Sequence, residues 1–468
     1  MIKKLIPIAL IASALLPVSC SAIIPAPTEI VTEPQSTATA SIPATKIRFQ
    51  KATPVPDSKP VSRTDIVQGT ASPFVSTPTP TNPESAALKG LRAAYVFEGN
   101  LYIQDGSGPA RKLTESGEDW YPSFSDDGKK IVFYRGLIPH ELYSVSVDGS
   151  EERALITQDV LLNLGYGDST ELRSLAFIPR THRLLFNTHE LDPLNVESKD
   201  QNRRGAKQNN DLLILDVDTG EIKPLLPPGA GGNFLVSPDG NLVAIQSDGR
   251  IDVVNIDGEI VYRNLVAYSP SQPTVLEPYV YWMPDSSGLL VLLPDKAQYE
   301  LEGPSTYTVW RYAFNVSAAL RVPLDPPVTD AGPFGISPDR NWILYNQFDF
   351  GALVSLNIGD LRNNTSQEYG QPCLPQGWSS DNRHFVCEII GQGLLLGSVS
   401  DPPVFIHPGI FLGWGDTSHY LYFDKSIGMV VLGEINGESV RLLHGAPTSS
   451  LRNGRNFFTF IFLNLISN

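Results

Sequence analysis

Short apolar runs separated by tight polar turns recur from about residue 90 to the end of the chain. The clearest example has Phe234–Val236 before Ser237-Pro238-Asp239-Gly240 and Leu242–Ile245 after it. Proline presets φ for the second position of a type I turn, aspartate caps the backbone, and glycine takes the last position without steric cost. The pattern therefore predicts two β-strands joined by a tight hairpin.

Copies of this turn recur every few tens of residues, and most are followed by a third and a fourth strand. In the first copy these strands are expected at Leu142–Val147 and Arg153–Ile156, and in the second at Leu212–Asp216 and Ile222–Leu225. A four-stranded unit with this period is typical of a β-propeller blade, which buries both faces only when blades stack in a ring. The seven copies begin at Ser125, Ile178, Ser237, Met283, Ser337, Ser379 and Gly415.

The two ends of the repeat region each carry part of one further unit. Residues 91–114 match the second, third and fourth strands of a blade, with no first strand before them. Ser450–Arg455 and the apolar run Phe457–Leu463 resemble the first hairpin of another copy. We therefore predict an all-β propeller of four-stranded antiparallel blades, in which the ends share one blade and the total is eight. Seven blades are the alternative if a weak copy, such as that at Pro179, is absorbed differently.

The repeat resembles that of TolB-like propellers and the related WD-like repeats. The resemblance rests on the Ser237–Gly240 turn with its flanking strands, and on a third strand that starts at Leu142-Tyr143 and ends before Asp148-Gly149. It covers roughly residues 91–460 and implies the architecture, because the repeat itself carries no chemistry. It also implies a role in a complex of the cell envelope. The chain departs from TolB in having no separate α/β domain before the propeller.

The first residues have the pattern of an export signal. A basic start at Met1–Lys4 precedes the apolar run Leu5–Val18, which is too short for a membrane-spanning helix. The run ends before Cys20 and resembles a bacterial lipoprotein signal, although Pro17 stands where that family usually has leucine. The resemblance implies cleavage after residue 19 and palmitate-type acyl chains on Cys20. The alternative is an ordinary secretory signal with an incidental cysteine.

Residues 20–88 have the composition of a disordered tether. They are rich in proline, threonine, serine and alanine, and their only aromatic residues are Phe49 and Phe74. Such a segment does not bury enough apolar surface to fold. We therefore expect a signal peptide at 1–19, a lipid-anchored tether at 20–88 and a propeller at 89–468. This arrangement places the propeller at the cell membrane, on its extracytoplasmic side, attached through the lipid anchor only.

Charge and cysteine content restrict the partners and the redox chemistry. The formal net charge of −15 argues against binding to nucleic acid and against docking on anionic lipid. We expect a monomer. Besides Cys20 the chain has only Cys373 and Cys387, which flank one predicted hairpin. An exported domain permits a disulfide between them, and two free buried thiols are the alternative.

No strong catalytic motif is present. Gly167–Glu171 approaches the nucleophile elbow Gly-x-Ser-x-Gly but ends in glutamate. His140 and His189 are each followed by glutamate, as in zinc proteases, but Ser144 and Pro193 occupy the position of the second histidine. We therefore predict no catalytic residue, no metal and no cofactor, and we favour a protein that is not an enzyme.

The long loops are expected on one face of the propeller, between second and third strands and between blades, and we call this the loop-rich face. Its largest insertion, Thr188–Asn210, is either a solvated loop or a basic contact for an anionic glycan or an acidic partner. Aromatic rings near these loops can stack on sugars or anchor a protein. The candidate ligand residues are Trp120, Tyr121, His140, Tyr166, His189, Arg203, Arg204, Lys207, Tyr268, Tyr279, Tyr299 and Tyr307.

The sequence therefore favours a membrane-anchored propeller that binds an envelope protein or a polysaccharide through its loop-rich face. The alternative is a glycan lyase or hydrolase with a site on the same face, to which His140 and His189 would contribute.

Overall fold

The structure is a computed structural model. It describes residues 90–136, 140–191, 207–247, 249–268, 277–295, 306–316, 318–329, 331–349, 352–435, 440–441 and 458–462. The chain divides into two units, Met1–Pro78 and Thr79–Asn468, and every described residue belongs to the second. The expected signal peptide, Cys20 and the tether lie outside the described residues.

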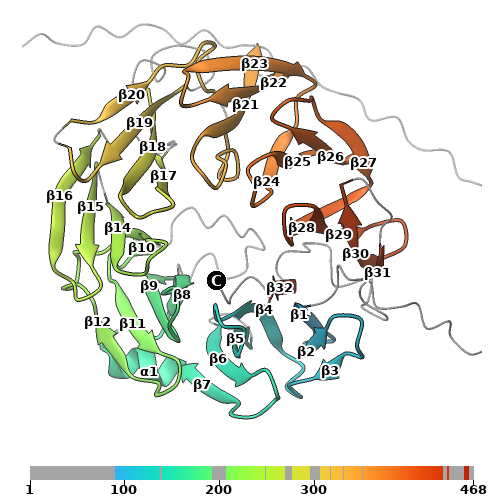
Figure 1. The fold of residues 1–468 in the computed structure, drawn as a ribbon. Coiled ribbons are helices and arrows are strands. Elements are labelled where there is room, and N and C mark those ends of the chain that lie inside the picture. The colour runs from blue at the N-terminus through green and yellow to red at the C-terminus, as the bar shows by residue number, and fades with distance from the viewer. Residues whose placement is uncertain are drawn as a thin grey trace, which may run out of the picture. The chain divides into compact units, whose positions relative to one another are not determined.

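Eight antiparallel sheets follow one another around a ring, which confirms the prediction of an eight-bladed propeller (Figure 1). We number the blades from 1 to 8 and name their strands from the centre outward. Blade 1 has β32 (Phe458–Phe462), β1 (Leu91–Phe97), β2 (Asn100–Asp105) and β3 (Arg111–Lys112). Blade 2 has β4 (Asp119–Phe124), β5 (Lys130–Arg135), β6 (Glu141–Ser146) and β7 (Arg153–Ile156).

Blades 3 to 5 continue the ring. Blade 3 has β8 (Thr170–Phe177), β9 (Arg183–Glu190), β11 (Leu213–Asp216) and β12 (Ile222–Pro224), with the short β10 (Lys207–Gln208) paired to the end of β9. Blade 4 has β13 (Asn233–Val236), β14 (Leu242–Ser247), β15 (Arg250–Asn255) and β16 (Ile260–Ala267). Blade 5 has β17 (Tyr279–Trp282), β18 (Gly288–Pro294), β19 (Tyr307–Ala313) and β20 (Leu320–Val322).

The remaining blades lead back to blade 1. Blade 6 has β21 (Trp342–Asp349), β22 (Ala352–Asp360) and β23 (Thr365–Gly370). Blade 7 has β24 (Leu374–Trp378), β25 (His384–Ile389), β26 (Gly393–Ser398) and β27 (Val404–His407). Blade 8 has β28 (Gly409–Trp414), β29 (His419–Asp424), β30 (Met429–Glu434) and β31 (Val440–Arg441).

Blade 1 is shared by residues from the two ends of the repeat region, as the sequence predicts. β32 pairs antiparallel with β1, and the register places Leu91 opposite Phe462 and Tyr95 opposite Phe458. Leu91, Tyr95 and Phe458 are buried together in the core between blades 8 and 1. The pairing therefore closes the ring through both backbone hydrogen bonds and apolar packing.

Blade 6 departs from the expected four strands. Its innermost segment meets β21 through an isolated bridge between Ile336 and Ile343 and a hydrogen bond from Leu344 N–H to the Gly335 carbonyl, 2.8 Å long. At the turn, Ser337 N–H also donates to the Trp342 carbonyl at 3.0 Å. Pro333 has no N–H to donate to a sheet, and Gly332 has a φ of 59°, which interrupts an extended strand. The sequence pattern of the turn is present, but the backbone before it does not form a regular strand.

The turn between the first two strands explains why the repeat uses serine and aspartate. Ser237 is fully buried, and its hydroxyl accepts from Leu242 N–H at 2.9 Å and donates to Asp239 Oδ1 at 2.5 Å. Gly240 N–H donates to the Ser237 carbonyl at 2.9 Å, and Gly240 has a φ of 75°, which favours glycine. The same serine–aspartate pair recurs at Ser337. Each such turn is therefore closed by its own side chains.

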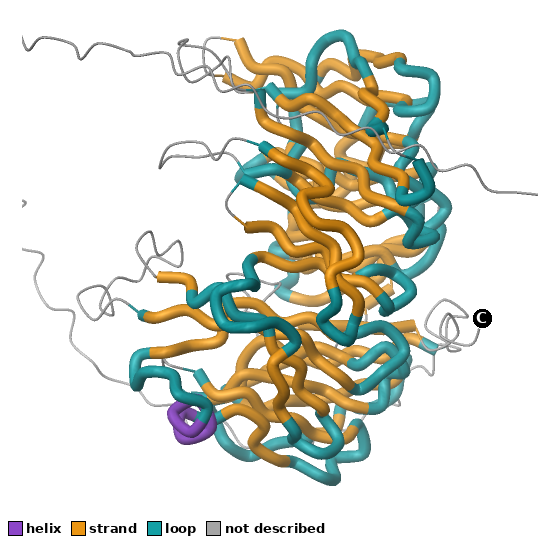
Figure 2. Tube along the Cα trace, turned by 90° about the vertical axis from the view of Figure 1, so that its left-hand side faces the viewer, coloured by secondary structure: helices purple, strands orange, loops and turns teal. Residues whose placement is uncertain are grey.

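The core consists of apolar clusters between neighbouring blades. Phe133 and Val145 of blade 2, for example, pack on Ala94 and Leu101 of blade 1. In Figure 2 the strands lie between two sets of loops, and the single helix of the described residues, α1 (Gln158–Asn163), lies with one of them. Of the described helices, none is long and apolar enough to cross a membrane.

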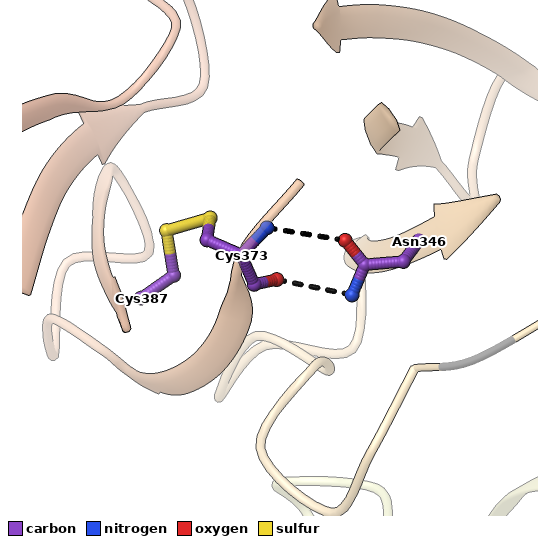
Figure 3. Close-up of a disulfide and its surroundings, with 3 residues drawn as sticks. All are labelled: Asn346, Cys373 and Cys387. Carbon is purple, nitrogen blue, oxygen red and sulfur yellow. Dashed lines mark hydrogen bonds between the residues drawn. A yellow bond between two sulfur atoms is a disulfide. The ribbon is translucent and has the colours of Figure 1, made fainter. Parts of the chain in front are cut away.

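A disulfide joins Cys373 to Cys387 in blade 7 (Figure 3). Their Cα atoms are 5.6 Å apart, and both residues are fully buried. The side chain of Asn346, from blade 6, donates to the Cys373 carbonyl at 3.0 Å and accepts from Cys373 N–H at 3.3 Å. The disulfide therefore lies where blades 6 and 7 meet.

Candidate functional site

A buried glutamate lies between two histidines where blades 2 and 3 meet on the loop-rich face. The register of β8 and β9 places Glu171 directly opposite His189, and Glu171 Oε2 lies 3.8 Å from His189 Nε2. Glu171 Oε1 lies 2.7 Å from His140 Nδ1 and also accepts from His140 N–H at 3.3 Å. Since only 7 % of Glu171 is exposed, its carboxylate fixes the orientation of His140 across the blade boundary.

Two tyrosine rings continue this cluster toward solvent. The Tyr134 ring meets His140 edge-on, with ring centroids 6.0 Å apart, and Tyr121 meets Tyr134 edge-on at 5.9 Å. Burial, and secondarily the Glu171 carboxylate, raises the pKa of Tyr134, so that its phenol stays neutral. We call Tyr121, Tyr134, His140, Glu171 and His189 the tyrosine–histidine cluster.

Tyr121 has an unusual backbone. Its φ is 49°, in the left-handed region that large side chains rarely adopt, and the pairing of β4 with β5 is irregular between Trp120 and Ser123. A conformation of this kind costs of order 1–3 kcal/mol and is concentrated at functional sites. The result is that the Tyr121 ring, 36 % exposed, is presented at the surface while its inner edge contacts Tyr134.

Comparisons with known proteins assign the chain to no family. No family model matches the chain, and no curated protein matches it. Among solved structures, oligogalacturonate lyase in complex with manganese is 15 % identical, with a TM-score of 0.43 over 65 % of this chain and 81 % of that one. Porphyromonas gingivalis dipeptidyl peptidase 4 is 12 % identical, with a TM-score of 0.46 over 71 % and 54 %. TolB from Acinetobacter baumannii is 12 % identical, with a TM-score of 0.31 over 60 % and 63 %.

A second polar network lies beside the cluster and supports the end of β9. The Tyr166 hydroxyl donates to Asp211 Oδ2 at 2.6 Å, and Thr188 donates to the same oxygen through Oγ1 at 2.8 Å. Thr188 N–H donates to Asp211 Oδ1 at 2.9 Å. Burial, and next the bond to Asp211, raises the pKa of Tyr166. These bonds satisfy the buried Asp211 carboxylate, and they hold the Tyr166 side chain in place beside the end of β9.

The other predicted ligand residues are dispersed. Tyr307 is buried against Tyr279 between blades 5 and 6, and the Tyr268 hydroxyl donates to the Ser247 carbonyl at 3.1 Å. Trp120 is half-buried in β4. The structure therefore brings together Tyr121, His140 and His189, and Trp120 adjoins them because it precedes Tyr121 in β4 and lies opposite Tyr134. Tyr268, Tyr279 and Tyr307 lie in blades 4 and 5. Arg203, Arg204 and Tyr299 lie outside the described residues, and of Lys207 only the backbone, in β10, is described.

Sequence reasoning missed Glu171 and Tyr134 as members of the site. In the sequence Glu171 is the last position of an incomplete nucleophile elbow, and Tyr134 lies in an ordinary second strand. The available signal was a carboxylate directly before the apolar residues that lead to the turn at Ile178, because a carboxylate is costly to bury there without a partner. Within the described ranges, no group of three or more histidine, cysteine, aspartate or glutamate residues is arranged to hold a metal ion.

Proposed function

We propose that this protein is an extracytoplasmic, membrane-anchored propeller that binds an envelope glycan or protein through its loop-rich face. The observation that carries the proposal is the exposed Tyr121 ring, held on a left-handed backbone and supported from behind by Tyr134 and His140. A ring that is already fixed loses little entropy on binding, and it can stack on a sugar or fill a pocket in a partner.

The membrane part of the proposal rests on the sequence. The apolar run before Cys20 and the proline-rich segment after it support a lipid anchor and a tether. The net charge of −15 supports a partner that is neither nucleic acid nor an anionic membrane surface. The propeller is proposed to act as a monomer that presents its loop-rich face to the partner.

A glycan lyase or hydrolase is the second candidate, and one observation favours it. Glu171 has an imidazole nitrogen within 4 Å of each carboxylate oxygen, at 2.7 Å and 3.8 Å, which is a set of groups able to move protons. Binding is the stronger proposal because Glu171 is almost completely buried and is engaged by His140. Turnover of a polysaccharide that is lost in His140→Ala would replace the binding proposal with the enzymatic one.

The test compares Tyr121→Ala with a matched control on the same face. Ile390, 74 % exposed between β25 and β26 of blade 7, is an apolar side chain on a loop of the same face. We expect Tyr121→Ala to weaken binding to envelope glycans or a captured envelope protein by tenfold or more, about 1.4 kcal/mol. Ile390→Ala should leave binding unchanged.

Tyr121→Gly separates the ring from its backbone. Glycine adopts a positive φ without strain, so this variant should fold at least as well as the wild type but bind as weakly as Tyr121→Ala. Equal binding by the wild type and both Tyr121 variants would refute the proposed contact.

A further inference from the structure

A half-buried arginine lies two residues beyond Glu171 on the same innermost strand. Arg173 occupies the irregular position of β8, where the pairing with β9 shifts between Leu172 and Ser174. Its Nη1 is buried and has no partner, and none of the residues the structure describes forms a hydrogen bond with its guanidinium. Burial lowers the pKa of Arg173, and the charge that opposes this effect is Glu277.

Asn187 fixes the place of Arg173 relative to blade 4. The Asn187 side chain accepts from Ser174 N–H at 3.1 Å and donates to the Gly232 carbonyl at 2.8 Å. Gly232 is followed by Asn233, the first residue of β13. The irregular segment of β8 is therefore tied to the start of the neighbouring innermost strand.

A second unpartnered donor lies at this start. Asn233 is directly opposite Gln246 in the register of β13 and β14, and its side chain donates to Glu277 Oε2 at 3.1 Å. Gln246 is only 8 % exposed, and within the described ranges its Nε2 has no hydrogen-bond partner. We call Arg173, Asn233, Gln246 and Glu277, from blades 3 to 5, the Arg173 group.

The composition of the Arg173 group indicates what it recognises. A buried donor left without a partner costs about 1–3 kcal/mol, so the donors of Arg173 and Gln246 are expected to have an acceptor in the bound state. A guanidinium pairs well with a carboxylate, in a planar arrangement that lysine does not offer. Glu277 is exposed, and Asn233 engages one of its oxygens, which leaves the other to accept a hydroxyl.

We propose that Arg173 and Gln246 bind a carboxylate on the ligand, while Glu277 accepts a neighbouring hydroxyl. This combination fits a uronic acid residue of a glycan, and a free small carboxylate is the other source of the same group. The inference rests on the proposed function and deepens it, because it names the charged group of the ligand that the loop-rich face accepts.

Titration calorimetry of the full chain with sodium glucuronate, glucose and sodium acetate tests this proposal. Glucuronate should bind, glucose should not, and Arg173→Gln and Gln246→Leu should each weaken glucuronate binding by tenfold or more. Acetate binding as strong as that of glucuronate would assign the site to free carboxylates and overturn the role of Glu277. If none of the carboxylates binds, or if Arg173→Gln binds glucuronate as the wild type does, the proposal is wrong.

The same titration separates this proposal from the binding role of Tyr121. If glucuronate binding depends on Arg173 while Tyr121→Ala leaves capture of every envelope partner intact, the carboxylate site stands and the Tyr121 contact does not. If Tyr121→Ala abolishes capture while no carboxylate binds the wild type, the proposed function stands and the Arg173 group is not a ligand site.

A pair of stability measurements tests the unpartnered arginine without any ligand. Arg173→Met removes a buried donor that has no partner, so it should raise the midpoint of thermal unfolding. Arg340 is the matched control, because burial lowers its pKa as it does that of Arg173. Unlike Arg173, Arg340 has partners: Nε donates to the Trp282 carbonyl and Nη1 to the Ser337 carbonyl, both at 2.8 Å. Arg340→Met should lower the midpoint. A lower midpoint for Arg173→Met as well would make Arg173 structural and overturn the proposal.

Discussion

Removing the disulfide with Cys373→Ala and Cys387→Ala should cost stability by a calculable amount. The bond closes a loop with a sequence separation of 14. In the chain-entropy model, the entropy lost by the unfolded chain is about 10 cal/mol/K for a loop of this length, or about 3 kcal/mol at 25 °C. We expect the double variant to lose about that much free energy of unfolding in urea. Its m-value should rise, because the unfolded chain without the bond exposes more surface.

Reduced wild-type protein is the control that separates the cross-link from packing. Both cysteines are fully buried, so alanine also removes the packing of two sulfur atoms. Reduction keeps those atoms and breaks only the bond, and it should account for most of the loss. A double variant within 1 kcal/mol of the oxidised wild type would refute the entropic reasoning. So would a reduced protein as stable as the oxidised one.

Two further predictions concern polar contacts within blade 2 and between blades 2 and 3. His182 links blades 2 and 3, because its ring nitrogens lie 2.7 Å from Asp218 Oδ2 and 3.2 Å from Asp127 Oδ1. Burial opposes protonation of the ring. The two carboxylates outweigh this effect and raise the pKa of His182 above its ordinary value of 6.5. The stability that it contributes is therefore full below pH 6.5 and is lost as the pH rises through the raised pKa, as urea unfolding at pH 5.5 and 8.5 will measure. The fully buried Asp119 carboxylate lies 2.6 Å from Arg135 Nε. Asp119→Ala removes this partner of Arg135 and should lower the free energy of unfolding by about 3–5 kcal/mol in the same assay.

Each of these predictions has its own control. The wild type should be more stable at pH 5.5 than at pH 8.5, and His182→Ala should remove this difference. If the variant shows the same difference as the wild type, His182 is not its source. Glu221→Ala removes the partner of Lys223 Nζ, 2.8 Å away, in a pair whose two side chains are both more than half exposed, and should cost less than about 1 kcal/mol. An equal loss from Asp119→Ala and Glu221→Ala would contradict the argument from burial.

The fold was predictable because each repeat carries the residues that form its own hairpin turn. Ser237 and Asp239 form the hydrogen bonds that close their turn within six residues, so the signal is local and readable. The shared blade was predictable for a different reason, since a missing first strand at one end matched an unpaired apolar run at the other. The three-stranded blade 6 was not, because Gly332 and Pro333 interrupt a segment whose turn still has the repeat pattern.

The site was only partly predictable because its parts come from different repeats. His140 follows β5 of blade 2, whereas Glu171 and His189 belong to blade 3, and their meeting depends on how neighbouring blades pack. Tyr121 is chemically an ordinary aromatic residue in the sequence, and only its positive φ distinguishes it. Arg173 and Gln246 became notable only when the structure showed which donors have no acceptor.

The pairing of β32 with β1 also sets the order in which the protein can be completed. Leu91 and Phe462 are nearly the whole length of the propeller apart in sequence, so this contact forms only after almost all of the domain has been synthesised. Until then β1 presents an unpaired edge, with the apolar Leu91 and Tyr95 that β32 later covers. Until β32 is available, the incomplete propeller can therefore associate with other protein chains through the exposed edge of β1.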